Sequence, residues 1–153
     1  MRLQIRAIGR LKSGPERELI DLYRRRLTWQ LDIHEIDDRK ISGDTPERMA
    51  REAELLTADL PPGAVVIALD ERGRDLSSRD FAERLITWRD EGRQPIVLMI
   101  GGADGLDRAL VKRADLVLSL GRLTWPHMMV RAMLTEQLFR AQSIHQGHPY
   151  HRD

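Results

Sequence analysis

The chain has 153 residues, no cysteine, and a formal charge of +1 that comes from 25 basic and 24 acidic side chains. This length suits one domain around a single core, and the lack of cysteine excludes disulfides, thiolate nucleophiles and zinc–thiolate clusters. Because the net charge is close to zero, any attraction to a nucleic acid has to come from a local patch of basic residues.

The first half of the chain predicts two strands, each followed by a helix. Apolar residues that alternate with polar ones predict a half-buried strand ending at Gly9, and a second strand is predicted at 31–36. Apolar residues at helical spacing predict helices at 15–27 and 45–60, and Ser13 is expected to cap the first of them.

The second half contains three fully apolar runs, which are typical of strands covered on both faces. These runs lie at 64–69, 96–100 and 116–120. Residues 70–74 are predicted to form a polar turn after the first run. Helices are predicted after the serines at 77 and 78, at 107–114, and from 126 to about 144. The alternation of strand and helix predicts a single α/β domain, residues 1–153, with a mainly parallel sheet.

Ligands of open α/β sheets lie beyond the carboxyl ends of the strands, so the segments after the three apolar runs are candidates for a site. These segments span 69–73, 100–106 and 120–127. The middle segment carries glycines at 101, 102 and 105, a spacing that matches neither the dinucleotide fingerprint nor the Walker loop. It therefore argues against ATP or GTP hydrolysis. A purely structural turn and a ligand loop are both compatible with these glycines.

The last predicted helix carries two candidate residues near its start. His127 and Arg131 lie one turn apart on the same face, directly after the third strand-end segment. A functional role is favoured for both, and the alternatives are a helix-start contact for His127 and a solvated charge for Arg131. The same helix is apolar around more than half of its circumference. This width predicts a homodimer interface in addition to core packing.

Three histidines recur at three-residue intervals near the end of the chain, at positions 145, 148 and 151. Glycine and proline between them interrupt any helix that would align their rings, so no metal site is expected. The segment 148–152 suits RNA instead, because Arg can bind phosphates while His and Tyr stack on bases. The alternative is a frayed tail without a function.

Five short motifs occur in order along the chain. They are Leu69-Asp70-x-x-Gly73, Ile100-Gly101-Gly102-x-x-Gly105-Leu106, Leu123-Thr124-x-Pro126-His127-x-x-x-Arg131, Glu136-Gln137-x-x-Arg140-Ala141 and Pro149-Tyr150-His151-Arg152. Their order and spacing strongly resemble the RlmH family, the SPOUT-class methyltransferases of 23S ribosomal RNA. The resemblance extends over the whole chain.

The resemblance implies a SPOUT-type α/β fold with a trefoil knot and a homodimer that methylates N3 of a pseudouridine in 23S rRNA of the assembled ribosome. The implied methyl donor is S-adenosylmethionine, and no metal is implied. The cofactor contacts carried over from the family are Leu69, Gly101, Arg122, Leu123, Thr124, Trp125, Pro126 and His127. All of them belong to the three strand-end segments.

Methyl transfer to N3 needs a group that removes the N3 proton or stabilises the anionic ring. The candidate catalytic residues are His127, Arg131, Tyr150, His151 and Arg152. The last three are expected to reach the cofactor of the partner subunit.

The chain shows neither a secretory signal nor an apolar run of membrane-spanning length, so a cytoplasmic enzyme without a membrane partner is expected. Two alternatives come from other classes. One is a non-catalytic, ribosome-associated RNA-binding protein. The other is a flavodoxin-like domain that binds a nucleotide phosphate at the Gly101-Gly102 turn.

Overall fold

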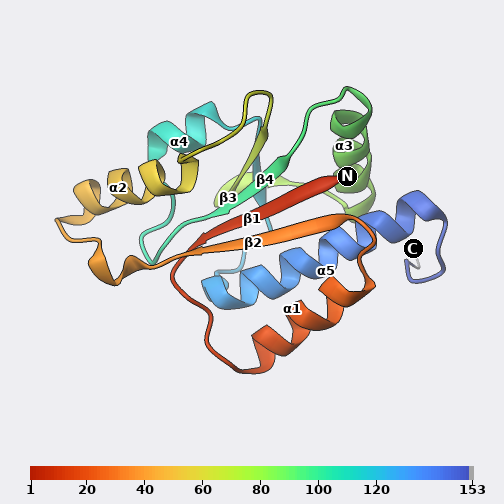
Figure 1. The fold of residues 1–153 in the computed structure, drawn as a ribbon, viewed down its shortest axis with the longest axis horizontal. Coiled ribbons are helices and arrows are strands. Elements are labelled where there is room, and N and C mark those ends of the chain that lie inside the picture. Colours follow the sequence, from red (N-terminus) through yellow and green to blue (C-terminus); the bar gives the residue numbers. More distant parts are fainter. Residues whose placement is uncertain (152–153) are drawn as a thin grey trace.

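The computed structural model describes residues 1–151 and contains one five-stranded sheet between two layers of helices (Figure 1). The strands are β1 (Arg2–Ile8), β2 (Gln30–Ile36), β3 (Val65–Asp75), β4 (Ile96–Ile100) and β5 (Leu116–Ser119). All neighbouring strands are parallel, in the order β2-β1-β4-β3-β5. The predicted α/β fold with a parallel sheet is confirmed, and the trefoil knot stays a prediction.

The helices divide between the two faces of the sheet (Figure 1). One face is covered by α1 (Pro15–Arg26), α3 (Ser78–Asp90) and α5 (His127–Gln146), and the other by α2 (Thr45–Thr57) and α4 (Arg108–Arg113). A short 3-10 helix, η1 (Asp38–Lys40), follows β2. Within residues 1–151 the buried apolar residues form one cluster on the side of α2 and α4, and a large and a small cluster on the side of α1, α3 and α5.

Strand β4 lies in the middle of the sheet, and all five of its residues are buried. Because successive side chains of a strand point to opposite faces, Leu98 packs toward α3 and α5 while Val97 and Met99 pack toward α2 and α4. Burial on both faces explains why this strand appears in the sequence as an uninterrupted apolar run.

Strand β3 is longer than predicted, so the predicted polar turn at 70–74 is wrong. The strand continues to Asp75, and its pairing with β5 shifts register between Leu69 and Arg74, which both pair with Leu118. An added Cβ at Gly73 would lie 2.7 Å from the carbonyl carbon of Leu118, too close for any other residue. The residues after Leu69 therefore form an outward bulge within the strand, and their polarity reflects that exposure.

Helix α1 begins without the predicted side-chain cap. Its N-cap is Gly14, with no side-chain hydrogen bond to the first turn, and Pro15 is its first residue. Proline there needs no hydrogen-bond partner for its nitrogen and has the φ angle of a helix already, so the start of the helix does not depend on Ser13.

Helix α5 packs against α1, α3 and the sheet at once, which accounts for most of its wide apolar surface. Leu134, Leu138 and Ala141 are fully buried in the larger apolar cluster, and Ala132 is buried against Leu11 and Ile20. The apolar width of α5 is therefore not by itself evidence of a partner subunit.

Candidate active site

The three strand-end segments converge on one cavity of about 160 Å³, which we call the strand-end pocket. It is lined by Leu69, Asp70, Glu71, Ile100, Gly101, Gly102, Gly105, Leu118, Ser119, Leu120, Gly121, Leu123, Thr124, Trp125, His127 and Val130. Parallel strands end at the same edge of the sheet, which brings together residues up to about 60 positions apart in the chain.

A larger cleft of about 940 Å³, the outer cleft, adjoins the strand-end pocket. Leu69, Trp125 and His127 line both cavities. The outer cleft carries three basic residues, Arg72, Arg108 and Lys112, and three acidic ones, Asp70, Glu71 and Asp104. Pro126 lines the outer cleft, whereas Arg122 is exposed and belongs to the lining of neither cavity. Seven of the eight predicted cofactor residues thus line one or both cavities.

The glycine segment is a tight turn in which backbone lies against backbone. An added Cβ at Gly101 would lie 2.5 Å from the carbonyl carbon of Gly105. The N–H of Gly105 donates a hydrogen bond of 3.1 Å to the carbonyl of Gly102, and Gly105 has a φ of +84°. These close contacts require glycine for the shape of the turn, and the same turn also forms one wall of the strand-end pocket, so the ligand-loop interpretation stays a prediction.

His127 is the first residue of α5, and its imidazole lies between the two cavities and the end of β1. A Cβ added at Gly9 would be 3.7 Å from both His127 Cε1 and Arg131 Nη2. The buried His127 Nδ1 has no hydrogen-bond partner among residues 1–151.

The surroundings of His127 keep its ring neutral. Burial and the nearby Arg131 guanidinium lower the pKa of His127 below its ordinary value, and Asp38 opposes this effect. A neutral imidazole at neutral pH can accept a proton from a group that enters either cavity.

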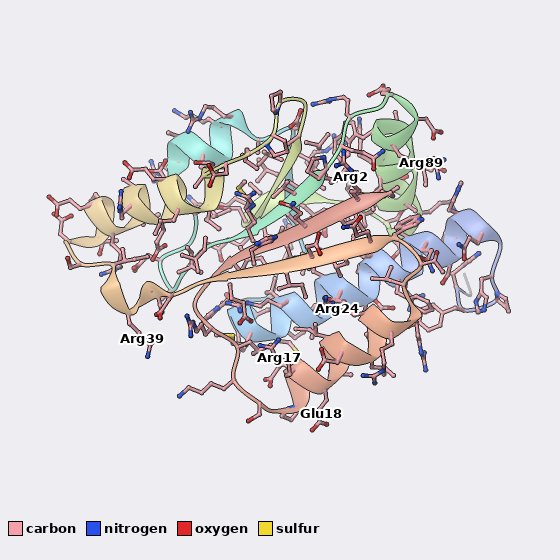
Figure 2. All side chains as sticks on the ribbon, in the orientation of Figure 1. Arg2, Arg17, Glu18, Arg24, Arg39 and Arg89 are labelled. Carbon is pink, nitrogen blue, oxygen red and sulfur yellow. The ribbon has the colours of Figure 1, made fainter. Side chains whose placement is uncertain are left out.

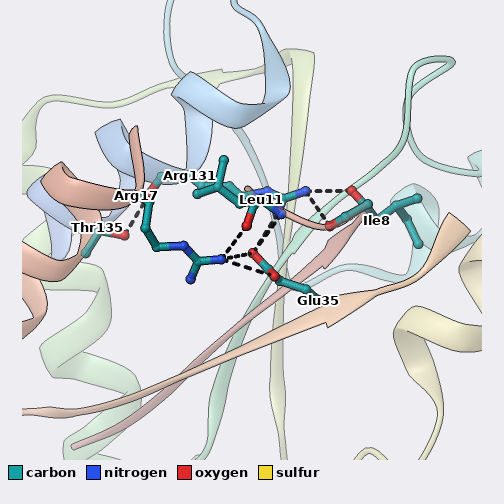
Figure 3. A network of polar contacts seen from close by, with 7 residues as sticks. Ile8, Leu11, Arg17, Glu35, Arg131 and Thr135 are labelled. Atoms are coloured by element: carbon teal, nitrogen blue, oxygen red, sulfur yellow. Dashed lines mark hydrogen bonds and ion pairs between the residues drawn. The ribbon is translucent and has the colours of Figure 1, made fainter. Parts of the chain in front are cut away.

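Arg131 is buried at the centre of a polar network (Figure 3). Its Nη2 donates to the carbonyls of Ile8 and Gly9, at 2.6 and 3.0 Å, and its Nη1 lies 3.2 Å from Glu35 Oε1. Arg17 reaches the same carboxylate from α1, also at 3.2 Å. The alternative of a solvated charge is therefore wrong.

The network assigns Arg131 a positioning task. The side chain is only 1% exposed and fastens the first turns of α5, which carry His127, to the end of β1 and to β2. Direct contact with a substrate would require these bonds to break, so the catalytic role expected for Arg131 gains no support from its position.

Tyr150 packs on α1 and α5 of its own subunit rather than in the strand-end pocket. The Tyr150 ring lies 4.7 Å from that of Phe139, and its hydroxyl is 2.9 Å from Glu136 Oε1 and 3.3 Å from Tyr23 Oη. The Arg140 guanidinium lies over the Tyr150 ring. Burial and hydrogen bonds to Tyr23 and Glu136 raise the pKa of Tyr150, so its hydroxyl can donate a hydrogen bond but is no base near neutral pH.

The other two tail candidates are His151 and Arg152. His151 is half-buried, and its Nδ1 has no hydrogen-bond partner within the part of the chain that the structure describes. Arg152 lies outside the described residues. Neither Tyr150 nor His151 lines the strand-end pocket or the outer cleft, so within one subunit the two sets of candidate catalytic residues are separate.

Two acidic residues near the site were not predicted from the sequence. Glu52 of α2 is buried, and its carboxylate accepts a hydrogen bond from the backbone N–H of Gly102. Asp38 of η1 is close enough to raise the pKa of His127. The sequence does contain a signal for the burial of Glu52, because this residue lies one turn before Leu56 on the buried side of α2. The sequence contains no comparable signal for Asp38.

Among residues 1–151, no group of three His, Asp or Glu side chains is arranged to hold a metal ion. Over the same range, no helix combines the length and the apolar character that crossing a membrane requires. Basic side chains project from several separate elements, including Arg2 on β1, Arg24 on α1 and Arg89 on α3, so charge alone singles out no RNA surface (Figure 2).

Comparison with known proteins agrees with this arrangement. A family model described as "Predicted SPOUT methyltransferase" matches residues 1–151. Similar proteins named "Ribosomal RNA large subunit methyltransferase H" occur in Paramagnetospirillum magneticum, at 56% identity, and Rhodospirillum centenum, at 53%, each covering 99% of both chains. One from Roseobacter denitrificans is 50% identical over the full length of both. The chain therefore belongs to the SPOUT methyltransferase family.

Proposed function

We propose that this chain uses S-adenosylmethionine to methylate N3 of a pseudouridine in 23S rRNA on the assembled ribosome. The observation that carries the proposal is the convergence of the three strand-end segments on one pocket, since these are the segments that the family resemblance assigns to the cofactor. The names of the similar proteins support ribosomal RNA of the large subunit as the substrate.

The strand-end pocket has the lining that such a donor needs. Leu69, Ile100 and Val130 supply apolar surface for an adenine ring and an aliphatic chain, while the glycine turn and Gly121 present bare backbone for hydrogen bonds. Bound S-adenosylmethionine would supply an electrophilic methyl group on a sulfonium. The residues of this chain have to hold the acceptor nitrogen in line with that methyl and exclude water.

His127 is the residue that we assign to the proton of the acceptor. It borders both the strand-end pocket and the outer cleft, so it adjoins a donor in the first and a nucleotide in the second. The neutral imidazole of His127 would accept the proton that N3 loses when it takes the methyl group from the sulfonium. Arg131 helps to keep that imidazole neutral and in place.

We also propose that the chain works as a homodimer through a groove between α1, α3 and α5, which we call the helix groove. Its volume is about 480 Å³, and Leu19, Phe81, Met129 and Met133 contribute to its lining, with Leu19 40% exposed. The lining of the groove also includes Tyr23 and Glu136, which hold Tyr150, and residues 118–121, which line the strand-end pocket as well.

A second copy seated in this groove would bring the tail of one subunit toward the strand-end pocket of the other. In this arrangement Tyr150, His151 and Arg152 would take part in the reaction of the partner subunit. Within their own subunit, Tyr150 and His151 line neither the strand-end pocket nor the outer cleft. It also explains why an apolar groove borders the pocket.

The decisive experiment uses ribosomes from cells that lack the modification. The purified protein is incubated with these ribosomes and labelled S-adenosylmethionine, and the modified nucleotide is mapped by primer extension and mass spectrometry. We expect one labelled pseudouridine, methylated at N3. Binding to ribosomes without label transfer, and without affinity for S-adenosylmethionine, would favour the non-catalytic RNA-binding protein instead.

A further inference from the structure

The carboxylate of Glu52 is an unusual group in this fold, because it is only 6% exposed and is held by a backbone N–H. The donor is Gly102, in the turn that forms one wall of the strand-end pocket. The contact is close: a Cβ added at Gly102 would lie 2.9 Å from Glu52 Oε1. Glycine at this position is therefore what allows the turn to approach the carboxylate.

A second residue of α2 holds the same turn. Arg48 lies one helical turn before Glu52, and its guanidinium forms an ion pair with Asp104. The two side chains thus attach α2 to both ends of the segment 102–104. Neither lines the strand-end pocket or the outer cleft, so both act on the back of the turn while its front borders the cavities.

We propose that Glu52 is a positioning residue for the methyl donor, which keeps the turn at 101–105 in the conformation that binds the cofactor. The inference rests on the function proposed above, because it presumes that the strand-end pocket holds S-adenosylmethionine. It extends that proposal to a residue that does not touch the donor.

The energetics of the site favour a task of this kind. Burial raises the pKa of Glu52 above its ordinary value; the Gly102 N–H and Arg48 oppose this effect, and Asp104 and Asp38 add to it. A carboxylate in such a place makes the fold less stable at neutral pH than a neutral side chain of the same shape would. The carboxylate is, however, a strong hydrogen-bond acceptor. It can therefore hold a glycine-rich turn in place, although such a turn loses much conformational entropy when it becomes ordered.

The test compares Glu52→Ala and Glu52→Gln with Glu54→Gln, an exposed glutamate on the same helix. Amide exchange of Gly102 and Gly105 is measured by NMR without cofactor, and the Kd for S-adenosylmethionine is measured by calorimetry. In Glu52→Ala we expect both the exchange rates and the Kd to rise by about tenfold or more, because a hydrogen bond to a charged acceptor is lost. Glu54→Gln should match the wild type in both measurements.

Glu52→Gln separates a positioning role from simple support of the fold. Its amide oxygen can still accept from Gly102, so it should recover most of the cofactor affinity and melt at a higher temperature than the wild type. The Kd of the wild type should rise as the pH falls and Glu52 becomes protonated. The Kd of Glu52→Gln should rise less, because only the protonation of other pocket residues such as His127 remains.

Wild-type exchange and affinity in Glu52→Ala would overturn the inference, as would equal pH profiles for the wild type and Glu52→Gln. If Glu52→Ala does not fold, the pH comparison with Glu52→Gln decides the matter alone. Failure of the wild type to bind S-adenosylmethionine would count against the proposed function. Exchange at Gly102, measured without cofactor, would then still decide whether Glu52 orders the turn.

Discussion

Nη2 of Arg131 donates a hydrogen bond of 2.6 Å to the carbonyl oxygen of Ile8, 123 positions earlier in the chain. This bond joins the start of α5 to the end of β1, and through Glu35 the same guanidinium also reaches β2 and α1. It therefore fixes the element that carries His127 relative to the sheet edge where the three strand-end segments meet.

Removal of this arginine should destabilise the fold strongly. Arg131→Ala leaves the backbone carbonyls of Ile8 and Gly9 without this donor, whereas Glu35 keeps Arg17 as a partner. We expect the free energy of unfolding to fall by about 2–5 kcal/mol, because each buried acceptor left unpaired costs about 1–3 kcal/mol. Urea denaturation followed by circular dichroism measures the change. Arg108→Ala, at an exposed position, is the control and should stay within about 0.5 kcal/mol of the wild type.

The stability of the fold should fall on acidification because of His127. Its pKa is lowered in the folded state, so between the unfolded and the folded pKa the unfolded chain binds more protons. The contribution of His127 to the free energy of unfolding is complete above the pKa of the unfolded state, about 6.5. It is lost as the pH falls through the lower pKa of the folded state. Urea denaturation at several pH values should show a smaller loss for His127→Asn than for the wild type.

Methyl transfer should depend on His127 in its neutral form. We expect His127→Asn to slow single-turnover methylation of ribosomes by about 10²-fold or more, the usual effect of losing a positioned base. In the wild type the rate should decline as the pH falls through the lowered pKa of His127. A wild-type rate in His127→Asn at saturating cofactor would assign the proton to another group, with His151 the next candidate.

A side chain at Gly101 should eliminate cofactor binding. The Cβ of Gly101→Val would collide with the backbone of Gly105 and Leu106, at 2.5 and 2.9 Å, and the turn would have to open. Calorimetry with S-adenosylmethionine should show no measurable binding, while Ala103→Val, at an exposed position of the same turn, should bind as the wild type does. Unchanged affinity in Gly101→Val would move the cofactor site away from the strand-end pocket.

A charge in the helix groove should separate the proposed dimer. Leu19→Glu places a carboxylate on the exposed apolar side chain at the edge of the groove, and burying that charge at an interface would cost several kcal/mol. Light scattering should report a dimer for the wild type and a monomer for Leu19→Glu. Ala50→Glu, on α2 in the opposite layer, should stay dimeric. A monomeric wild type would refute the dimer proposal.

The segments that form the pocket were predictable because local rules govern them. The apolar run at 96–100 matches β4 to the residue, and parallel strands necessarily bring the segments that follow them to one edge. The bulge after Leu69 was not predictable. Polar residues that follow a buried strand indicate a turn, and only the pairing of Leu118 with both Leu69 and Arg74 shows that the strand resumes.

Periodicity and motif spacing are properties of neighbouring residues, so they were enough to predict the strand and helix order, the edge of the sheet that carries the candidate site, and the family resemblance. The contacts of the charged residues became visible only in the folded structure. Arg131 and Glu52 look like surface charges in their helices, because a local pattern does not show which backbone groups arrive from distant segments. Their partners, Ile8 and Gly102, lie far away in sequence and reach them only when the layers pack on the sheet.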